Sequence, residues 1–390
     1  MKLDGIKVLD LSQFLPGPHL TMMMADHGAD VIRIESPEGE PTRSIGARQD
    51  GQSVWFRNTH RGKRSVCLNL KQPQAVAAFM QLARDADVIV EAFRPGVVDR
   101  LGIGYAQVKA VNPRIVYCSI AAFGQTGPYA KRPAHDVSIE AETGLLSLNL
   151  GADGQPVLPC LPAADMAGSL MAMNGILMAL LRRATTGEGD YIDISMQDSL
   201  VSWLVNVVGP VFTEGRALVP KDERSFGGNA FYNIYCCADG KSLTLGGAEI
   251  KFASNLLNAL GRADLIALCK LPPGAGQLPV KTFLQQTFAS QPLAHWEQFL
   301  APLDVCWAPV KDLYEALQSP QLAAREMLLE FKPGDDAAKR NTALGIPIKF
   351  ANEPGKASSA LPALGEHTRQ VLLDAGCSEA QVAALISPAA

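Results

Sequence analysis

Residues 6–35 read IKVLDLSQFLPGPHLTMMMADHGADVIRIE, and this stretch decides the fold. Residues 6–11 and 30–35 are short apolar runs typical of buried strands, and residues 19–27 between them are predicted to form a helix. The sequence Pro16-Gly17-Pro18 predicts a turn, and Pro18 suits the first helical position because its ring presets φ. This order of elements predicts a β-α-β unit with parallel strands.

The same pattern continues along the chain. Apolar, β-branched runs at residues 65–70, 87–91 and 114–121 predict further strands, and residues 74–86 predict a helix between the first two. A long helix over residues 166–183 is followed by a strand at 191–194. We therefore expect an α/β protein whose main part is a large, doubly wound, Rossmann-like parallel sheet.

Changes in composition suggest a second domain. Residues 1–204 are expected to form the first part of the large domain, and residues 205–224, which mix Pro, Gly and charges, to form a linker. Strands at 230–236 and 241–245 and a helix at 249–260 predict a smaller α+β domain over residues 225–325. Residues 326–390 then read as a linker and a C-terminal return to the large domain, extended over 332–361 and helical near 365–375.

Composition excludes several functions. The net charge of −4 provides no basic field for nucleic acid, and no long uninterrupted apolar run predicts a membrane span. Without a visible secretory signal, and with eight scattered cysteines read as reduced thiols, we expect a cytoplasmic protein. The His and Cys spacings predict no metal site. Glu35 ends a strand where a ribose-binding acid would stand, but the glycine fingerprint of dinucleotide sites is missing.

Asp165 is one candidate for chemistry, because it stands directly before the predicted long helix. Its commonest role there would be that of an N-cap. A helix N-terminus also favours an ionised carboxylate, and free amides beside it could stabilise an oxyanion. The sequence around Asp165 leaves a structural and a catalytic role open.

His135 and Asp136 follow a Gly/Pro-rich loop after the strand at 114–121, so they should lie at the carboxyl edge of the sheet, where ligands of open α/β sheets bind. Histidine exchanges protons near neutral pH, and Asp136 could orient it. A loop histidine with a satisfied hydrogen bond is the alternative interpretation. The cations of residues 61–64, with Lys71, Arg94 and Arg100, could bind phosphate or form solvated surface.

Eight blocks together carry a resemblance to a known family over nearly the full chain. They are VLDLSQFLPGPH (8–19), DHGADVIRIE (26–35), RGKRSVCLNLKQP (61–73), EAFRPGVVDRLGIG (91–104), FGQTGPYAKRPAHD (123–136), the segment around Asp165, GEGDYIDISMQDS (187–199) and LGEHTRQVL (364–372). The chain resembles the CoA-transferase family III (CaiB/BaiF) and α-methylacyl-CoA racemase superfamily.

The resemblance implies a site and a partner. Asp165 matches the family's catalytic aspartate, the substrate is an acyl-CoA thioester, and no prosthetic group is needed. The fold implied is a large and a small domain in an obligate homodimer of interlocked rings. Coenzyme A would then lie along Phe14, Leu68, Lys71, Phe93, Arg94, Arg100, Leu101 and Lys131.

Two positions favour the racemase branch. His135 stands where transferases commonly have Tyr, and Glu249 in GGAEIKF matches a racemase glutamate that would tune His135 together with Asp136. The first hypothesis is proton transfer at the α-carbon between His135 and Asp165, with the thioester oxygen bound by amides at the helix start. The second is a CoA-transferase in which Asp165 is the nucleophile, and the third is a CoA-ester-binding protein without turnover. In the stretch 166–170, Ser169 and Leu170 stand where racemases usually have glycines, so side chains here are expected to alter the acyl pocket.

Overall fold

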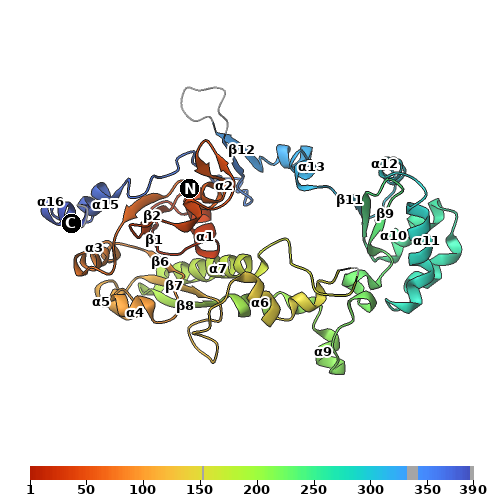
Figure 1. The fold of residues 1–390 in the computed structure, drawn as a ribbon, viewed down its shortest axis with the longest axis horizontal. Coiled ribbons are helices and arrows are strands. Elements are labelled where there is room, and N and C mark those ends of the chain that lie inside the picture. The colour runs from red at the N-terminus through yellow and green to blue at the C-terminus, as the bar shows by residue number, and fades with distance from the viewer. Residues whose placement is uncertain (152, 332–340, 387–390) are drawn as a thin grey trace. The chain divides into compact units, whose positions relative to one another are not determined.

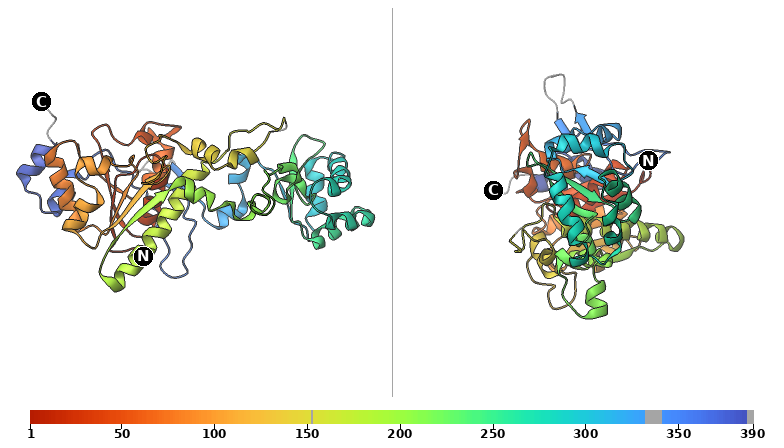
Figure 2. Two further views of the ribbon diagram at one scale, coloured as in Figure 1. Left: turned by 90° about the horizontal axis from the view of Figure 1, so that it is seen from below. Right: turned by 90° about the vertical axis from the view of Figure 1, so that its right-hand side faces the viewer.

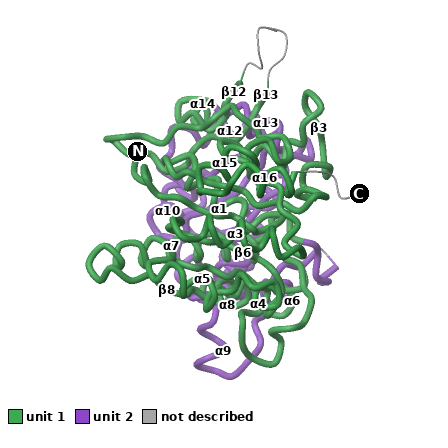
Figure 3. The backbone as a smooth tube through the Cα atoms, turned by 90° about the vertical axis from the view of Figure 1, so that its left-hand side faces the viewer, with its two compact units in different colours: residues 1–143, 159–203, 320–390 green, residues 144–158, 204–319 purple. Residues whose placement is uncertain are grey.

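The computed structural model describes residues 1–151, 153–331 and 341–386. These residues form two compact units (Figure 3). Unit 1 combines Met1–Thr143, Pro159–Trp203 and Pro320–Ala390, and unit 2 combines Gly144–Leu158 and Leu204–Ser319. The division into folding domains expected from the sequence stays a proposal, because compactness alone does not show which part folds independently.

Unit 1 is built on a six-stranded sheet. The strands are β1 (Lys7–Asp10), β2 (Asp30–Glu35), β5 (Arg64–Cys67), β6 (Val88–Glu91), β7 (Val116–Ala121) and β8 (Asp190–Ser195). Their order is β5-β2-β1-β6-β7-β8, and every neighbouring pair is parallel. The predicted parallel α/β sheet is confirmed. The chain fills the sheet outward from β1 in one direction and from β6 in the other, so the topological switch point lies between β1 and β6, where such sheets bind ligands.

Helices cover both faces of this sheet (Figure 1). On one face α1 (Pro16–Asp26) packs against α7 (Ala163–Thr186), and α7 also contacts β7 and β8. On the other face Leu9, Ile32, Ile89 and Tyr117 share a core with buried side chains such as Phe79. The helices of that second layer are α3 (Pro73–Arg84), α5 (Tyr105–Val111), α15 (Thr368–Asp374) and α16 (Glu379–Ile386).

Shorter elements lie in the connections of unit 1. They are α2 (Val54–His60), α4 (Val97–Leu101), α6 (Asp136–Glu142), α8 (Met196–Val201), α14 (Pro320–Ala324) and the hairpins β3 (Arg48–Gln49) with β4 (Gln52–Ser53) and β12 (Leu328–Phe331) with β13 (Asn341–Leu344).

A buried charge network fixes the turn after β1. Lys63 Nζ donates to Asp10 Oδ2 and to the Pro18 carbonyl, both at 2.9 Å, and Arg33 pairs with Asp10 and Glu40. Because these side chains are all buried, removing one partner would leave an uncompensated charge. Helix α1 begins at Pro16, two residues before the position expected from Pro18. The structure therefore uses these charges to hold the turn between β1 and α1.

The C-terminal segment packs on unit 1. The Gly62 amide donates to the Ala360 carbonyl at 3.0 Å, and the Lys356 amide donates to the Asp26 carbonyl at 2.7 Å. The predicted helix near residues 365–375 is α15. Residues 332–340 of the predicted extended stretch lie outside the described residues.

Unit 2 contains an antiparallel sheet in the order β11-β10-β9, formed by β9 (Tyr232–Cys236), β10 (Ser242–Gly246) and β11 (Trp307–Pro309). Its helices include α10 (Ile250–Ala259), α11 (Leu278–Phe288) and α12 (Leu293–Leu300), seen from two further directions in Figure 2. Tyr235, Phe288 and Trp296 are the aromatic centre of its core. The two strands and the helix predicted after residue 230 are confirmed.

In the part of the chain that the structure describes, α7 is the one helix long and apolar enough to cross a bilayer by length and composition. Ala164, Ala167, Ala172 and Ile176 of this helix are fully buried within the protein. A core helix of a globular protein meets the same two criteria.

Candidate active site

A cavity of about 600 Å³ lies at the switch point of the sheet. Gln13 and Phe14 line it after β1, Phe93 and Arg94 line it after β6, and the loop after β7 contributes a further wall. His135 and Asp165 both line this cavity. The structure thus brings together the two side chains that the sequence singled out for proton transfer.

His135 directly precedes α6 and is exposed. Its ring meets the ring of Phe14 edge-on, with 6.1 Å between centroids. Phe14 has a φ of +64°, a left-handed backbone conformation that non-glycine residues rarely adopt. Such strain is found mainly at functional sites, where the surrounding fold enforces it. Here it turns the chain after β1 so that Phe14 lies beside His135.

Asp165 is not the N-cap of the long helix, and that expectation was wrong. Helix α7 begins at Ala163 with Pro162 as its N-cap, so Asp165 is the third residue of the first turn. Pro162 has no side-chain acceptor, and the capping acceptors instead come from α6, which the sequence could not show. Asp165 is therefore free of the capping role and is directed to the cavity.

The amides at the start of α7 are already occupied. Glu140 Oε1 accepts a hydrogen bond from the Ala163 amide at 3.0 Å. Asp136 Oδ1 accepts from the Ala164 amide at 2.8 Å and from the Asp165 amide at 3.1 Å. The expectation that free amides here would bind the thioester oxygen was wrong for the described structure, because two carboxyl groups already accept their hydrogen bonds.

The protonation of Asp165 is strongly perturbed. Burial, followed by the proximity of the Asp136 and Glu140 carboxyl groups, raises the pKa of Asp165 to about 7. Burial disfavours the charged form and like charges add to that effect. A carboxyl group that titrates near neutral pH can both accept and donate a proton there, which is the property required of an acid–base catalyst.

Side chains of residues 166–170 were expected to alter the acyl pocket, but these residues do not line the cavity. Of residues 165–170, Asp165 is the one among the described residues that lines it. Ala167, Gly168 and Ser169 are buried against other elements, and the Ser169 hydroxyl is 2.9 Å from His19 Nδ1. These substitutions therefore affect helix packing. Met196, at the start of α8, supplies an apolar wall beside Asp165 instead.

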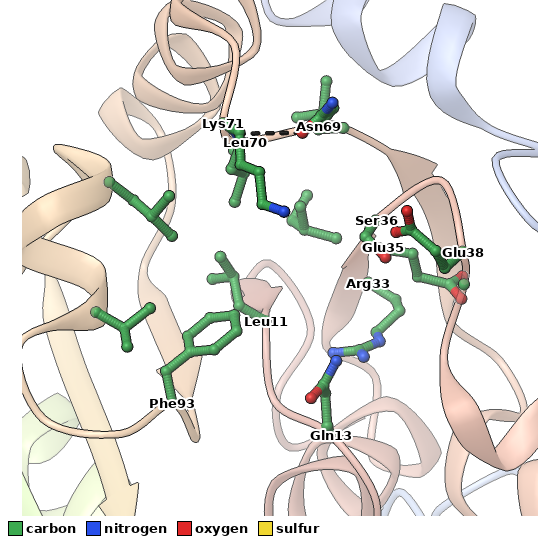
Figure 4. A pocket seen from close by; sticks show the side chains of 15 residues that line it. Leu11, Gln13, Arg33, Glu35, Ser36, Glu38, Asn69, Leu70, Lys71 and Phe93 are labelled. Carbon is green, nitrogen blue, oxygen red and sulfur yellow. Dashed lines mark hydrogen bonds between the residues drawn. The ribbon is translucent and has the colours of Figure 1, made fainter. Parts of the chain in front are cut away.

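A second cavity of about 390 Å³ adjoins the same loops (Figure 4). Leu68, Lys71, Phe93 and Leu101 line it, and that these residues bind coenzyme A stays a prediction. Figure 4 shows Lys71 and Glu38 reaching toward this cavity from different strand connections, with Leu11 and Phe93 along its apolar side. Gln13 lines both cavities, so one continuous wall joins them.

Other predicted site residues lie elsewhere. Arg100 and Lys131 are exposed and line neither of these two cavities, and Arg94 lines the cavity of Asp165. In the cationic run 61–64, Arg61 and Lys63 are buried and paired with Asp26 and Asp10. These two cations belong to the structural network, so neither the phosphate-binding nor the solvated-surface interpretation holds for them.

Glu249 and Asp136 were both expected to tune His135. Glu249 directly precedes α10 in unit 2 and is exposed, and its action on His135 stays a prediction. Asp136 directs Oδ1 to the start of α7. Glu35 is fully engaged by Arg43 and the Ser65 hydroxyl, in keeping with the rejected dinucleotide interpretation.

Sequence reasoning missed three residues of the site. Gln13 and Arg132 line the cavity and lie in recognised blocks, whereas Glu140 lies outside those blocks and contacts the start of α7. Glu140 is four residues after Asp136, so a helix predicted over this segment would have placed the two carboxyl groups on one face. Among the described residues, no group of three His, Cys, Asp or Glu side chains is arranged to hold a metal ion.

Comparison with known proteins agrees with this architecture. Residues 3–368 match the model of CoA-transferase family III. The chain is 34% identical to the acetyl-CoA:oxalate CoA-transferase of Acetobacter aceti, covering 84% of this chain and 85% of that protein. It is 31% identical to human alpha-methylacyl-CoA racemase, covering 98% and 95%.

A solved structure gives the same result. The crystal structure of a CAIB/BAIF family protein from Brucella suis superposes with a TM-score of 0.80 at 27% identity, covering 96% of this chain and 99% of that one. The same family is indicated by the parallel six-stranded sheet, by the nearly full-length family match and by relatives that include a CoA-transferase and a racemase. The chain belongs to CoA-transferase family III, whose members include CoA-transferases and racemases.

Proposed function

We propose that this protein is a 2-methylacyl-CoA racemase or epimerase that moves a proton at the carbon next to the thioester. The observation that carries the proposal is the shared cavity of His135 and Asp165, in which the pKa of Asp165 is raised to about 7. Inversion of an acidic carbon requires one group that removes the proton and a second group that returns it to the opposite face.

In the proposed reaction, one of these two groups removes the α-proton and forms an enolate, and the protonated form of the other returns a proton to the opposite face. The C–H bond electrons pass into the enolate and back, so no oxidant or acceptor is consumed. Reversing the roles of His135 and Asp165 converts the other stereoisomer. The donor to the enolate oxygen must come from outside the first three amides of α7, because carboxyl groups already bind these.

The adjoining cavity supports coenzyme A as the carrier. Apolar side chains such as Leu68 and Leu101 suit a planar base, and the Lys71 amino group suits a phosphate. Gln13 and Phe93 line both cavities, so a long thioester could extend from one into the other. We therefore place the nucleotide end in this second cavity and the acyl end beside Asp165.

A family III CoA-transferase is the second candidate, and a specific finding favours it. Several of the most similar relatives are CoA-transferases, including the oxalate enzyme at 34% identity and the succinate–glutarate CoA-transferase of Agrobacterium fabrum at 30%. In this reaction the Asp165 carboxylate attacks the thioester carbonyl and expels the thiolate of CoA, leaving an aspartyl anhydride. The thiolate then attacks the aspartyl carbonyl and releases the acyl group as a carboxylic acid, and the acceptor acid later takes the CoA from Asp165.

One experiment separates the two. A chiral 2-methylacyl-CoA is incubated with the protein in D₂O, with and without an added carboxylic acid. Deuterium at the α-carbon with loss of optical purity, independent of added acid, supports racemisation. Retained chirality with acid-dependent exchange of CoA and a hydroxylamine-sensitive adduct on the protein contradicts it and supports transfer.

We also propose that the protein acts as an interlocked homodimer. Large apolar side chains of α7 and the following segment are exposed in the single chain, among them Met178, Leu181, Trp203 and Val205. Exposed apolar surface of this kind marks protein contacts. Light scattering should give a dimer, and a monomer that is fully active would contradict this part of the proposal.

A further inference from the structure

Glu140 is a buried carboxyl group that the proposed reaction does not use. It lies on α6 and is fully buried. Oε1 accepts the Ala163 amide at 3.0 Å, but Oε2 is also buried and has no hydrogen-bond donor among the described residues. A buried carboxylate oxygen without a donor is costly, so this atom requires an explanation.

Another carboxyl group lies on the same face of α6. Asp136 precedes Glu140 by one helical turn, and the two side chains accept hydrogen bonds from the consecutive Ala164 and Ala163 amides at the start of α7. Ionised carboxylates are acceptors only, so a hydrogen bond between them requires a proton on one. Burial first, and then Asp136, raise the pKa of Glu140. Asp136 Oδ1 already accepts two backbone amides, whereas Glu140 Oε2 accepts none and is therefore the oxygen with room for the proton.

No cation offsets these charges in the described structure. The elements packed against α6 are α7 and α8, which contribute the carboxyl groups of Asp165 and Asp198. On α6 itself, Glu142 forms an ion pair with Arg132 at 2.6 Å. Among the described residues no ion pair includes Glu140, and a proton shared with Asp136 would relieve the buried charge.

We propose that Glu140 holds a proton in the resting protein and donates it from Oε2 to Asp136. The pair then caps α7 with one negative charge instead of two, and every buried oxygen of Glu140 has a partner. Glu140 is thus a positioning residue that acts on Asp165 through Asp136 and through the start of α7. The effect of Glu140 on Asp165 rests on the proposed role of Asp165 as the reacting group. The position of the proton on Glu140 does not depend on that role.

The substitution E140Q tests the consequence. A carboxamide keeps an acceptor for the Ala163 amide and supplies a fixed donor to Asp136, so it copies the protonated acid. The pH midpoint of kcat assigned to Asp165 should stay within about 0.3 unit of the wild-type value. Loss of the charge of Asp136 in D136N should lower that midpoint by about one unit or more. A fall of that size in E140Q would show that Glu140 is ionised and would overturn the proposal.

Infrared spectroscopy tests the proton directly and does not depend on activity. The spectrum of D165N/E140Q is subtracted from that of D165N at neutral pH. The difference should contain the C=O stretch of a protonated carboxyl group, and this band should shift in D₂O. The subtraction removes other protonated groups, such as Glu91, whose pKa burial raises to about 7. The matched variant E142Q should retain the band. If D165N and D165N/E140Q show no such difference, the proposal is wrong even when Asp165 is catalytic.

If E140Q folds poorly, the proposal can be tested without it, by comparing D165N with D165N/D136N. The protonated-carboxyl bands of D165N are compared with those of D165N/D136N, in which Glu140 loses its charged partner and should release its proton at lower pH. A band that does not respond to D136N contradicts the proposed pair. If the Glu140 band is present but the wild-type protein does not racemise its substrate, the proposed reaction is refuted and the proton on Glu140 is not. Failure of the proposed function can therefore be distinguished from failure of this inference.

Discussion

Replacing Asp165 by Asn should stabilise the folded protein, and the gain should increase with pH. The pKa of Asp165 is raised from 3.8 to about 7. A raised pKa means that folding favours the protonated form, so this favourable contribution is complete below about pH 4 and is lost as pH rises through about 7. Three pKa units correspond to about 4 kcal/mol at most, and because Asp165 is partly exposed we expect about 2 kcal/mol at pH 8.5.

The assay is urea unfolding of wild type and D165N at pH 8.5 and 5.5. The difference in free energy of unfolding should fall by roughly half at the lower pH, because at pH 5.5 the folded wild type binds the proton that the unfolded chain has lost, so wild type gains stability as the pH falls below about 7. D198N is the matched control: it removes an exposed carboxylate on α8 and should change stability by less than about 0.5 kcal/mol. A D165N protein no more stable than wild type at pH 8.5 would refute the reasoning about the buried charge.

Further predictions concern binding, proton transfer and stability. K71A should raise KM for acyl-CoA about tenfold with little change in kcat, measured by initial rates, because Lys71 lines the cavity assigned to the nucleotide end; an unchanged KM contradicts that assignment. H135N should reduce α-deuterium exchange by roughly 10²-fold or more, and unaltered exchange would favour the transferase reaction. R61A should cost about 3–5 kcal/mol in urea unfolding because it leaves Asp26 buried without its partner, and a loss below 1 kcal/mol would contradict the structural role of this pair.

The sheet could be predicted from the sequence because its strands are short, apolar and separated by helices. All six strands of the parallel sheet in unit 1 lie where the apolar runs indicated, within a few residues. Such runs depend on neighbouring residues, so local patterns reveal them. The loop position of His135 after β7 was indicated in the same way, whereas the family resemblance singled out Asp165, whose catalytic role stays a prediction.

The rest depends on contacts between distant segments. Asp136 and Glu140 cap α7 from 23 or more positions away, and no local pattern at Pro162 announces this. The cations Arg61 and Lys63 resemble an exposed basic run, yet their partners Asp26 and Asp10 come from other elements and bury them. In both cases burial and pairing decide the role of the charge, and neither is visible along one stretch of chain.

The most direct measurement follows the reaction of acyl-CoA with wild type, D165N and D198N under identical conditions, recording both α-deuterium exchange and release of CoA. We predict that D165N, folded as shown by circular dichroism, loses both by at least about 10²-fold while D198N matches wild type. Turnover by D165N within a few-fold of wild type would contradict the claim that the Asp165 carboxyl group reacts at the thioester.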